Sequence, residues 1–123
     1  MLDDNLIAKK SYDFALMIIK LYKYLSIDKK EYVLSKQLLK CGTSIGANIQ
    51  EAQAGISKKD FIAKMSISAK EALETRYWLN LLIDSGYISK DKKRTQKILN
   101  EIEAIIKILT KIIKTSQKGK YEQ

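Results

Sequence analysis

The chain has no proline and no histidine, and its 123 residues include one cysteine and five glycines. Because a proline ring breaks the hydrogen bonding of a helix interior, its absence predicts long, uninterrupted helices. The lack of histidine excludes the Ser-His and Cys-His pairs of hydrolases and the Glu-x-x-His ligands of di-iron bundles. A single cysteine cannot form an internal disulfide, so we expect a cytoplasmic protein.

A long hydrophobic run is also missing. The most apolar stretch near the start, FALMII at residues 14–19, is much shorter than the roughly 20 residues that cross a bilayer. We therefore expect no membrane contact. The chain length suits one domain with a single core, which we assign to residues 1–115, and we predict a flexible polar tail at residues 116–123.

Apolar residues recur at steps of three or four in four segments, a pattern typical of amphipathic helices. The predicted helices cover residues 5–26, 30–54, 57–86 and about 89 to the tail. Ser57, with Asp60 three residues later, predicts a capped helix start, and Gly55 and Gly86 predict helix ends. Since no alternating strand pattern competes, the predicted fold class is all-α.

Three of the five glycines lie in CGTSIGANIQEAQAG, residues 41–55. A phosphate-binding loop would place its glycines between a strand and a helix start, and that context is absent. On a helix, Gly42 and Gly46 instead form a small-residue strip beside the apolar stripe. Each costs about 1 kcal/mol relative to alanine, so we expect close packing, within the monomer or between subunits, to offset that cost.

The predicted helices carry more apolar surface than a lone bundle needs. The apolar positions of the fourth helix span an arc of about 140°, and Leu6, Met17 and Tyr24 form a second strip on the first. A larger core could use these wide stripes. We expect instead that the surplus is buried between the subunits of a homo-oligomer.

Two stretches resemble a family signature: QLLKCGTSIGANIQEA at residues 37–52 and SKKDFIAKMSISAKEALETRYWLNLL at residues 57–82. They are similar to the helical-bundle proteins encoded in intervening sequences of 23S ribosomal RNA genes, and the resemblance covers essentially the whole chain. The chain departs from the usual pattern at Lys40 and Cys41, where arginine and serine are common. The resemblance implies an up-down four-helix bundle that assembles into a ring-like homopentamer.

Relatives of this family include the accessory variability protein of diversity-generating retroelements. That protein uses a basic surface to engage nucleic acid and a reverse transcriptase. The resemblance therefore implies RNA or DNA and a reverse transcriptase as candidate partners. Many other members of the family stand alone without a known role.

A magnesium-dependent hydrolase is the main enzymatic alternative. Glu71 and Glu74 are three residues apart and face one way on a helix, as in the carboxylate pairs of all-α nucleotide pyrophosphohydrolases. Such enzymes need a second pair from another helix, whereas Glu101 and Glu103 point to different sides of theirs. We therefore predict a protein that is not an enzyme and has no metal site and no cofactor.

The same acidic residues suit a polar network between helices. We expect Glu71 and Glu74 to join Lys70, Arg76, Asn48 and Glu51, and the polar tips of Tyr77 and Trp78 to find partners. Cys41 lies on an apolar stripe and is predicted to be a core residue. The residues assigned to helix packing or oligomer contact are Gly42, Gly46, Ala47, Asn48, Glu51, Glu71, Glu74, Tyr77 and Trp78.

Positive charge is concentrated in the last segment of the chain. Of the net charge of +9, residues 89–123 supply +6, from ten Lys or Arg and four Asp or Glu. Lysines near the helix C-terminus suit the helix dipole, but a cluster at its N-terminus opposes that dipole. We therefore predict that an anionic partner binds this surface. The predicted nucleic-acid-binding residues are Lys90, Lys92, Lys93, Arg94, Lys97, Lys107, Lys111, Lys114 and Lys118.

The sequence leaves two functions open. The favoured one is a non-enzymatic, homo-oligomeric nucleic-acid-binding accessory factor of an RNA or reverse-transcriptase system. In a ring, the basic stripe repeats in every subunit and modest phosphate contacts add up. The alternative is a structural or protein-protein interaction ring in which the charge serves only solubility.

Overall fold

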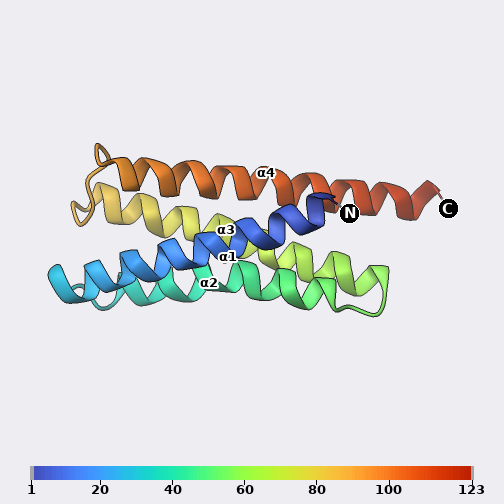
Figure 1. Ribbon diagram of the computed structural model, residues 1–123, viewed down its shortest axis with the longest axis horizontal. Helices are drawn as coiled ribbons and strands as arrows, with labels where there is room; N and C mark the ends of the chain where they lie inside the picture. Colours follow the sequence, from blue (N-terminus) through green and yellow to red (C-terminus); the bar gives the residue numbers. More distant parts are fainter. Residues whose placement is uncertain (1, 123) are drawn as a thin grey trace.

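The computed structural model describes the backbone of residues 2–122 and the side chains of residues 4–118. Four α-helices alternate in direction along one bundle (Figure 1), and no strand occurs in this described part of the chain. The helices are α1 (Leu2–Lys23), α2 (Leu34–Gln53), α3 (Lys58–Asp84) and α4 (Lys93–Glu122), with a π-helical turn, η1 (Tyr24–Asp28), after α1. The prediction of an all-α chain with four helices is confirmed.

Helix α3 has the boundaries that its flanking residues predict. The Ser57 side chain accepts a hydrogen bond of 3.1 Å from the backbone N–H of Asp60. At the other end, Gly86 adopts the left-handed conformation, with φ of 88°, which glycine reaches without steric cost. The capping pair and the helix stop at Gly86 are therefore confirmed.

The bounds of α4 differ from the prediction at both ends. The helix begins at Lys93, later than the expected start near residue 89. It continues to Glu122, so the backbone of residues 116–122, which we assigned to a polar tail, is helical. In Figure 1 this end of α4 projects past the turn between α2 and α3. Side chains of the tail beyond residue 118 lie outside the described residues.

Each helix packs against its neighbours in sequence, and α4 also contacts α1, which closes the bundle. The core contains fully buried side chains from all four helices, among them Phe14, Ile45, Leu79 and Ile105. The wide apolar arc of α4 is used inside this core. Its flanks, Leu99, Ile106 and Ile113, are partly buried against the bundle. Because these flanks are only partly buried, the expectation that the arc also supplies apolar surface to other subunits stays a prediction.

Gly42 and Gly46 face α1 within the same chain. A Cβ atom added to Gly42 would lie 2.8 Å from a side-chain carbon of Ile18. One added to Gly46 would lie 3.3 Å from the hydroxyl oxygen of Ser11. Both glycines therefore allow α1 to approach α2 closely, and this packing inside the monomer offsets their low helix propensity.

A buried carboxylate caps the start of α2, which we did not predict. Glu31 accepts hydrogen bonds from the backbone N–H groups of Val33 and Leu34, at 3.1 Å, and of Ser35, at 2.7 Å. These are donors that a helix start leaves unpaired. Burial by itself raises the pKa of Glu31, but these donors, with the Ser35 hydroxyl, outweigh it and hold the pKa below its ordinary value. This cap explains why α2 begins later than residue 30.

None of the described helices is both long and apolar enough to cross a membrane.

We predict that Gly42→Ala lowers the free energy of unfolding by about 1 kcal/mol. The added methyl group collides with Ile18, and overpacking of this kind costs about 1 to 3 kcal/mol, while alanine returns about 1 kcal/mol of helix propensity. Gly46→Ala is the matched control, because its methyl group meets only the edge of Ser11 and should cost less. Urea unfolding of both variants is the test, and a Gly42→Ala variant as stable as wild type contradicts the packing account.

We also predict that Glu31→Gln destabilises the protein at neutral pH and does so less in acid. The folded-state pKa is lowered, so the carboxylate stabilises the fold above its unfolded pKa, about 4.3, and that stabilisation disappears as the pH falls through the folded value. Loss of a helix cap costs about 1 kcal/mol. Urea unfolding at pH 7 and pH 3, with a substitution of the exposed Asp84, Asp84→Asn, as control, measures this. A difference from wild type that persists unchanged at pH 3 contradicts the prediction.

Candidate nucleic-acid interface

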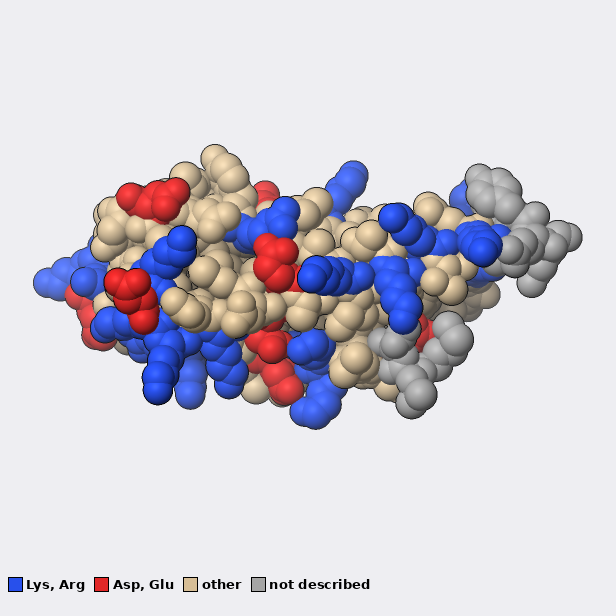
Figure 2. All heavy atoms as spheres, turned by 90° about the horizontal axis from the view of Figure 1, so that it is seen from above, with Lys and Arg blue, Asp and Glu red and all other residues tan. Residues whose placement is uncertain are grey.

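A stripe of lysines follows the outer face of α4. Its residues recur at helical spacing on the side opposite the buried isoleucines. Every one of these side chains is exposed, and Figure 2 shows lysine and arginine side chains along the length of this side of the molecule. The lysine stripe consists of Lys93, Lys97, Lys107, Lys111, Lys114 and Lys118.

Among the described side chains of α4, the two acidic ones lie at its borders with other helices. Glu101 accepts a hydrogen bond from Lys10 of α1 at 3.0 Å, and Glu103 accepts one from Arg76 of α3 at 2.9 Å. Pairs this exposed contribute at most about 1 kcal/mol each to stability. They do neutralise the two glutamates locally, so the lysines determine the charge of the outer face of α4.

The second half of the stripe borders a shallow groove. Lys107, Lys111 and Lys114 line this groove together with Thr110. The Thr110 hydroxyl donates to the carbonyl of Ile106 at 2.7 Å. Ammonium groups beside one groove suit a chain of phosphates, because they attract its successive negative charges.

The predicted basic cluster lies at the start of α4. Lys90 and Lys92 precede the helix, Lys93 and Arg94 belong to its first turn, and that turn has no acidic residue. Arg94 has a partner inside the molecule, since its guanidinium carbon lies 4.6 Å from the centre of the Tyr24 ring. An external anion is therefore not needed to explain Arg94, although it remains one explanation for the three lysines.

Beside this cluster, α1 with η1, the end of α3 and the start of α4 enclose a cleft of about 690 Å³. Its rim is basic, and no acidic residue occurs among the described residues that line it. The rim residues are Lys20, Lys29, Lys90, Lys92, Arg94 and Lys97. The apolar and aromatic lining residues include Met17, Leu21, Tyr24, Ile83, Tyr87 and Ile98.

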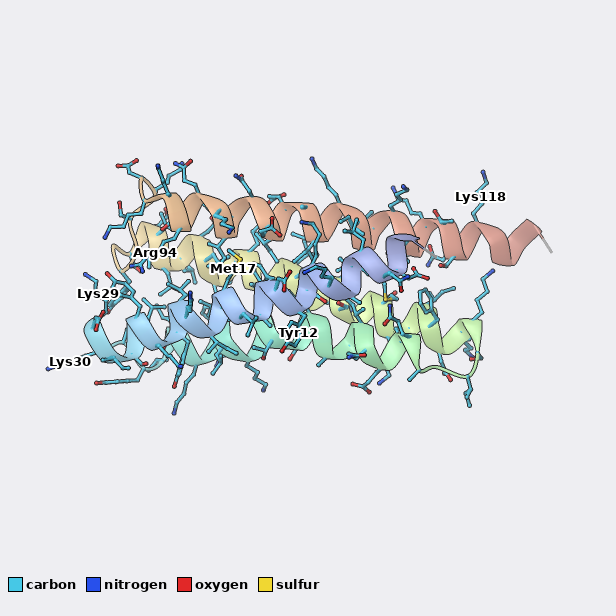
Figure 3. All side chains as sticks on the ribbon, in the orientation of Figure 1. Tyr12, Met17, Lys29, Lys30, Arg94 and Lys118 are labelled. Carbon is cyan, nitrogen blue, oxygen red and sulfur yellow. The ribbon has the colours of Figure 1, made fainter. Side chains whose placement is uncertain are left out.

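Figure 3 shows Met17, Lys29 and Arg94 at this end of the bundle, from three separate segments of the chain. Lys97 belongs both to the rim and to the lysine stripe, so the two surfaces are continuous. We did not predict this cleft, because the residues that form it are distant in sequence and only the packing of the helices brings them together.

The polar network expected around Glu71 and Glu74 does not form as predicted. Arg76 pairs with Glu103 of α4, and Glu51 of α2 pairs with Lys64 of α3 at 3.1 Å. Asn48 donates to the carbonyl of Ser44 in its own helix at 2.9 Å. Three of the predicted partners, Arg76, Glu51 and Asn48, thus make their contacts elsewhere, because their positions on the helices face other neighbours.

Tyr77 and Trp78 form an edge-to-face aromatic pair with ring centres 5.4 Å apart. Tyr77 is 58% exposed, whereas the indole nitrogen of Trp78 is buried and finds no hydrogen-bond partner among the described residues. The expectation that the polar tip of Trp78 is satisfied is therefore wrong. Ala47, from the same predicted group, lies exposed on the outer side of α2.

The seam between α2 and α3 holds two groups with shifted proton affinities. Burial and then the charge of Glu74 raise the pKa of Glu71, while the Lys40 ammonium opposes this. Burial raises the pKa of the Cys41 thiol to about 11, so it stays protonated at neutral pH, and its core position is confirmed. Within the described residues, no group of three or more Cys, Asp or Glu side chains is placed to hold a metal ion.

Comparisons with known proteins identify the family. The family model of the 23S rRNA-intervening sequence protein matches residues 3–111. A crystal structure from Bacteroides thetaiotaomicron, described as a protein of unknown function from the S23 ribosomal protein family, is 49% identical, with a TM-score of 0.87 over 91% of this chain and 98% of that chain. No curated protein matches the chain. The predicted resemblance is confirmed, and the chain belongs to the family of 23S rRNA-intervening sequence proteins.

Proposed function

We propose that this protein is a non-enzymatic accessory factor that binds nucleic acid without strong sequence preference. The observation that carries the proposal is the lysine stripe, exposed along α4 and continuous with the basic rim of the cleft. From Lys93 to Lys118 the stripe extends about 38 Å, at 1.5 Å per helical residue. That length allows contact with several successive phosphates, which position a strand but do not identify its bases.

Family resemblance supports an RNA or reverse-transcriptase system as the setting for this activity. A cytoplasmic location belongs with the same proposal, since those partners and a free thiol both fit a reducing compartment. The alternative is a structural or protein-protein interaction ring without a nucleic-acid role. In that alternative, the stripe only keeps the protein soluble.

We further propose that the protein acts as a ring-like homo-oligomer, a pentamer by family resemblance. Two separate groups of apolar side chains are exposed, one on α1 and one on α3. Each of these helices contacts α2 and α4, which places them diagonally across the bundle. The exposed residues are Leu6, Tyr12 and Leu16 on α1, and Ile67, Leu73 and Tyr77 on α3.

Two different patches on opposite sides favour head-to-tail contact, in which the α1 patch of one subunit meets the α3 patch of the next. Contacts of that kind close into a ring when the rotation between subunits permits it. A large contiguous apolar patch on the surface marks an interaction site, and we propose that each of these two groups forms one. A ring would also present the lysine stripe several times, which multiplies weak phosphate contacts.

We predict that wild-type protein sediments at micromolar concentration as a multiple of its 14.1 kDa chain mass. Leu16→Glu and Tyr77→Glu, one from each patch, should each yield folded monomer, because an unpaired charge is costly to bury. Val33→Glu, exposed outside both patches, is the control and should leave the mass unchanged. Sedimentation equilibrium measures the mass, and circular dichroism shows whether each variant is folded. A monomeric wild type overturns the ring.

We also predict salt-sensitive binding to RNA and DNA. Replacement of Lys93, Lys107 and Lys114 by glutamine should weaken binding and flatten the slope of log K against log salt, by about 0.7 to 0.9 for each phosphate that is no longer neutralised. The matched control replaces three exposed lysines away from α4, Lys36, Lys58 and Lys59, and removes the same net charge. Filter binding across a salt series gives both slopes. An equal decrease of affinity in the two triple variants would assign binding to net charge and not to the stripe.

A further inference from the structure

We propose that the cleft at the start of α4 holds one unpaired nucleotide of a bound single strand. The base would lie on the apolar and aromatic lining, and the flanking phosphates would contact the basic rim. This inference rests on the proposed nucleic-acid function and adds to it a preference for single-stranded over double-stranded nucleic acid.

The size and lining of the cleft suit one nucleotide. Its volume, about 690 Å³, falls in the range of small-ligand pockets, about 300 to 1,000 Å³. Apolar side chains from three helices line its interior, and the cationic groups come from residues on its rim. A nucleotide matches this arrangement, because its base has an apolar face and its phosphate is charged.

One wall of the cleft carries groups that stack on bases. Tyr24 and Tyr87 both line it, and the Arg94 guanidinium lies over the Tyr24 ring. Proteins that bind single strands commonly stack unpaired bases on aromatic rings and on guanidinium planes. Because Tyr24 already holds Arg94 in place, little side-chain freedom is lost when a ligand arrives. Tyr24 belongs to the π-helical turn η1, a feature frequent at functional sites.

Charge distinguishes a strand from a small free anion. Six cationic residues line the cleft, with no acidic residue among the described lining residues. The positive surface does not end at the rim, because Lys97 connects it to the lysine stripe along α4. A ligand that uses the whole surface must therefore be a polyanion longer than the cleft, with at least one group that fits inside it. A duplex offers no such group, since its bases are stacked and paired.

The test compares single-stranded and blunt duplex RNA of twelve nucleotides, titrated into the full chain by fluorescence anisotropy. Met17→Trp fills the cleft without a change in charge, and Ile56→Trp is the matched control, 97% exposed in the turn at the other end of the bundle. Wild type and Ile56→Trp should bind the single strand about five-fold or more tightly than the duplex, the effect of one stacked base. Met17→Trp should lose that preference and keep its affinity for duplex.

A second variant covers the case in which Met17→Trp does not fold. Lys20 is an exposed rim residue, so Lys20→Glu should reduce single-strand affinity more than duplex affinity. Lys58→Glu, an exposed residue at the start of α3 and at the other end of the bundle, should reduce both equally. Equal binding of the two RNAs by wild type, or an unchanged preference in the cleft variants, overturns the cleft and leaves the stripe intact. Absence of binding to either RNA overturns the proposed function and this inference with it.

Discussion

The contact between Gly42 of α2 and Ile18 of α1 sets the spacing on which the rest of the molecule depends. With no side chain at Gly42, Ile18 occupies the space where a Cβ atom would lie. Met17 and Leu21, on either side of Ile18 along α1, line the cleft. If α1 were displaced from α2, these two residues and the π-helical turn after them would move relative to α4. Gly42 is therefore a packing position, as its sequence context predicts, and through α1 it also helps to set the shape of the cleft.

The two faces of helix α4 have different roles. Its inner face supplies isoleucines to the core and its outer face carries the lysine stripe. Between them, Glu101 reaches α1 and Glu103 reaches α3. Residues two apart point to different sides of a helix, so each glutamate can join a different neighbour. Both glutamates therefore lie away from the outer face of α4, and their ion pairs connect α4 to α1 on one side and to α3 on the other.

Periodicity and capping residues were enough to predict four helices, the start of α3 at Ser57 and the burial of Cys41. Those signals are local, since each depends on residues within one or two helical turns. The start of α2 was not predicted, because Glu31 works through a bent backbone that no spacing rule describes. The cleft and the contact of Arg94 with Tyr24 were missed for a different reason. They depend on how far α1 and α4 approach each other, and a single sequence contains no measure of that distance.

The basic residues at the start of α4 oppose the positive end of the helix dipole. Cations at a helix N-terminus are unfavourable by about 0.3 to 1 kcal/mol each, and the first turn of α4 has no acidic residue to offset them. The Tyr24 ring compensates Arg94, but Lys90, Lys92 and Lys93 are exposed. Folded domains tend to tolerate such local disagreement where function requires it. A bound phosphate backbone would reverse the sign of the effect, because it turns the repulsion among these cations into attraction to a shared anion.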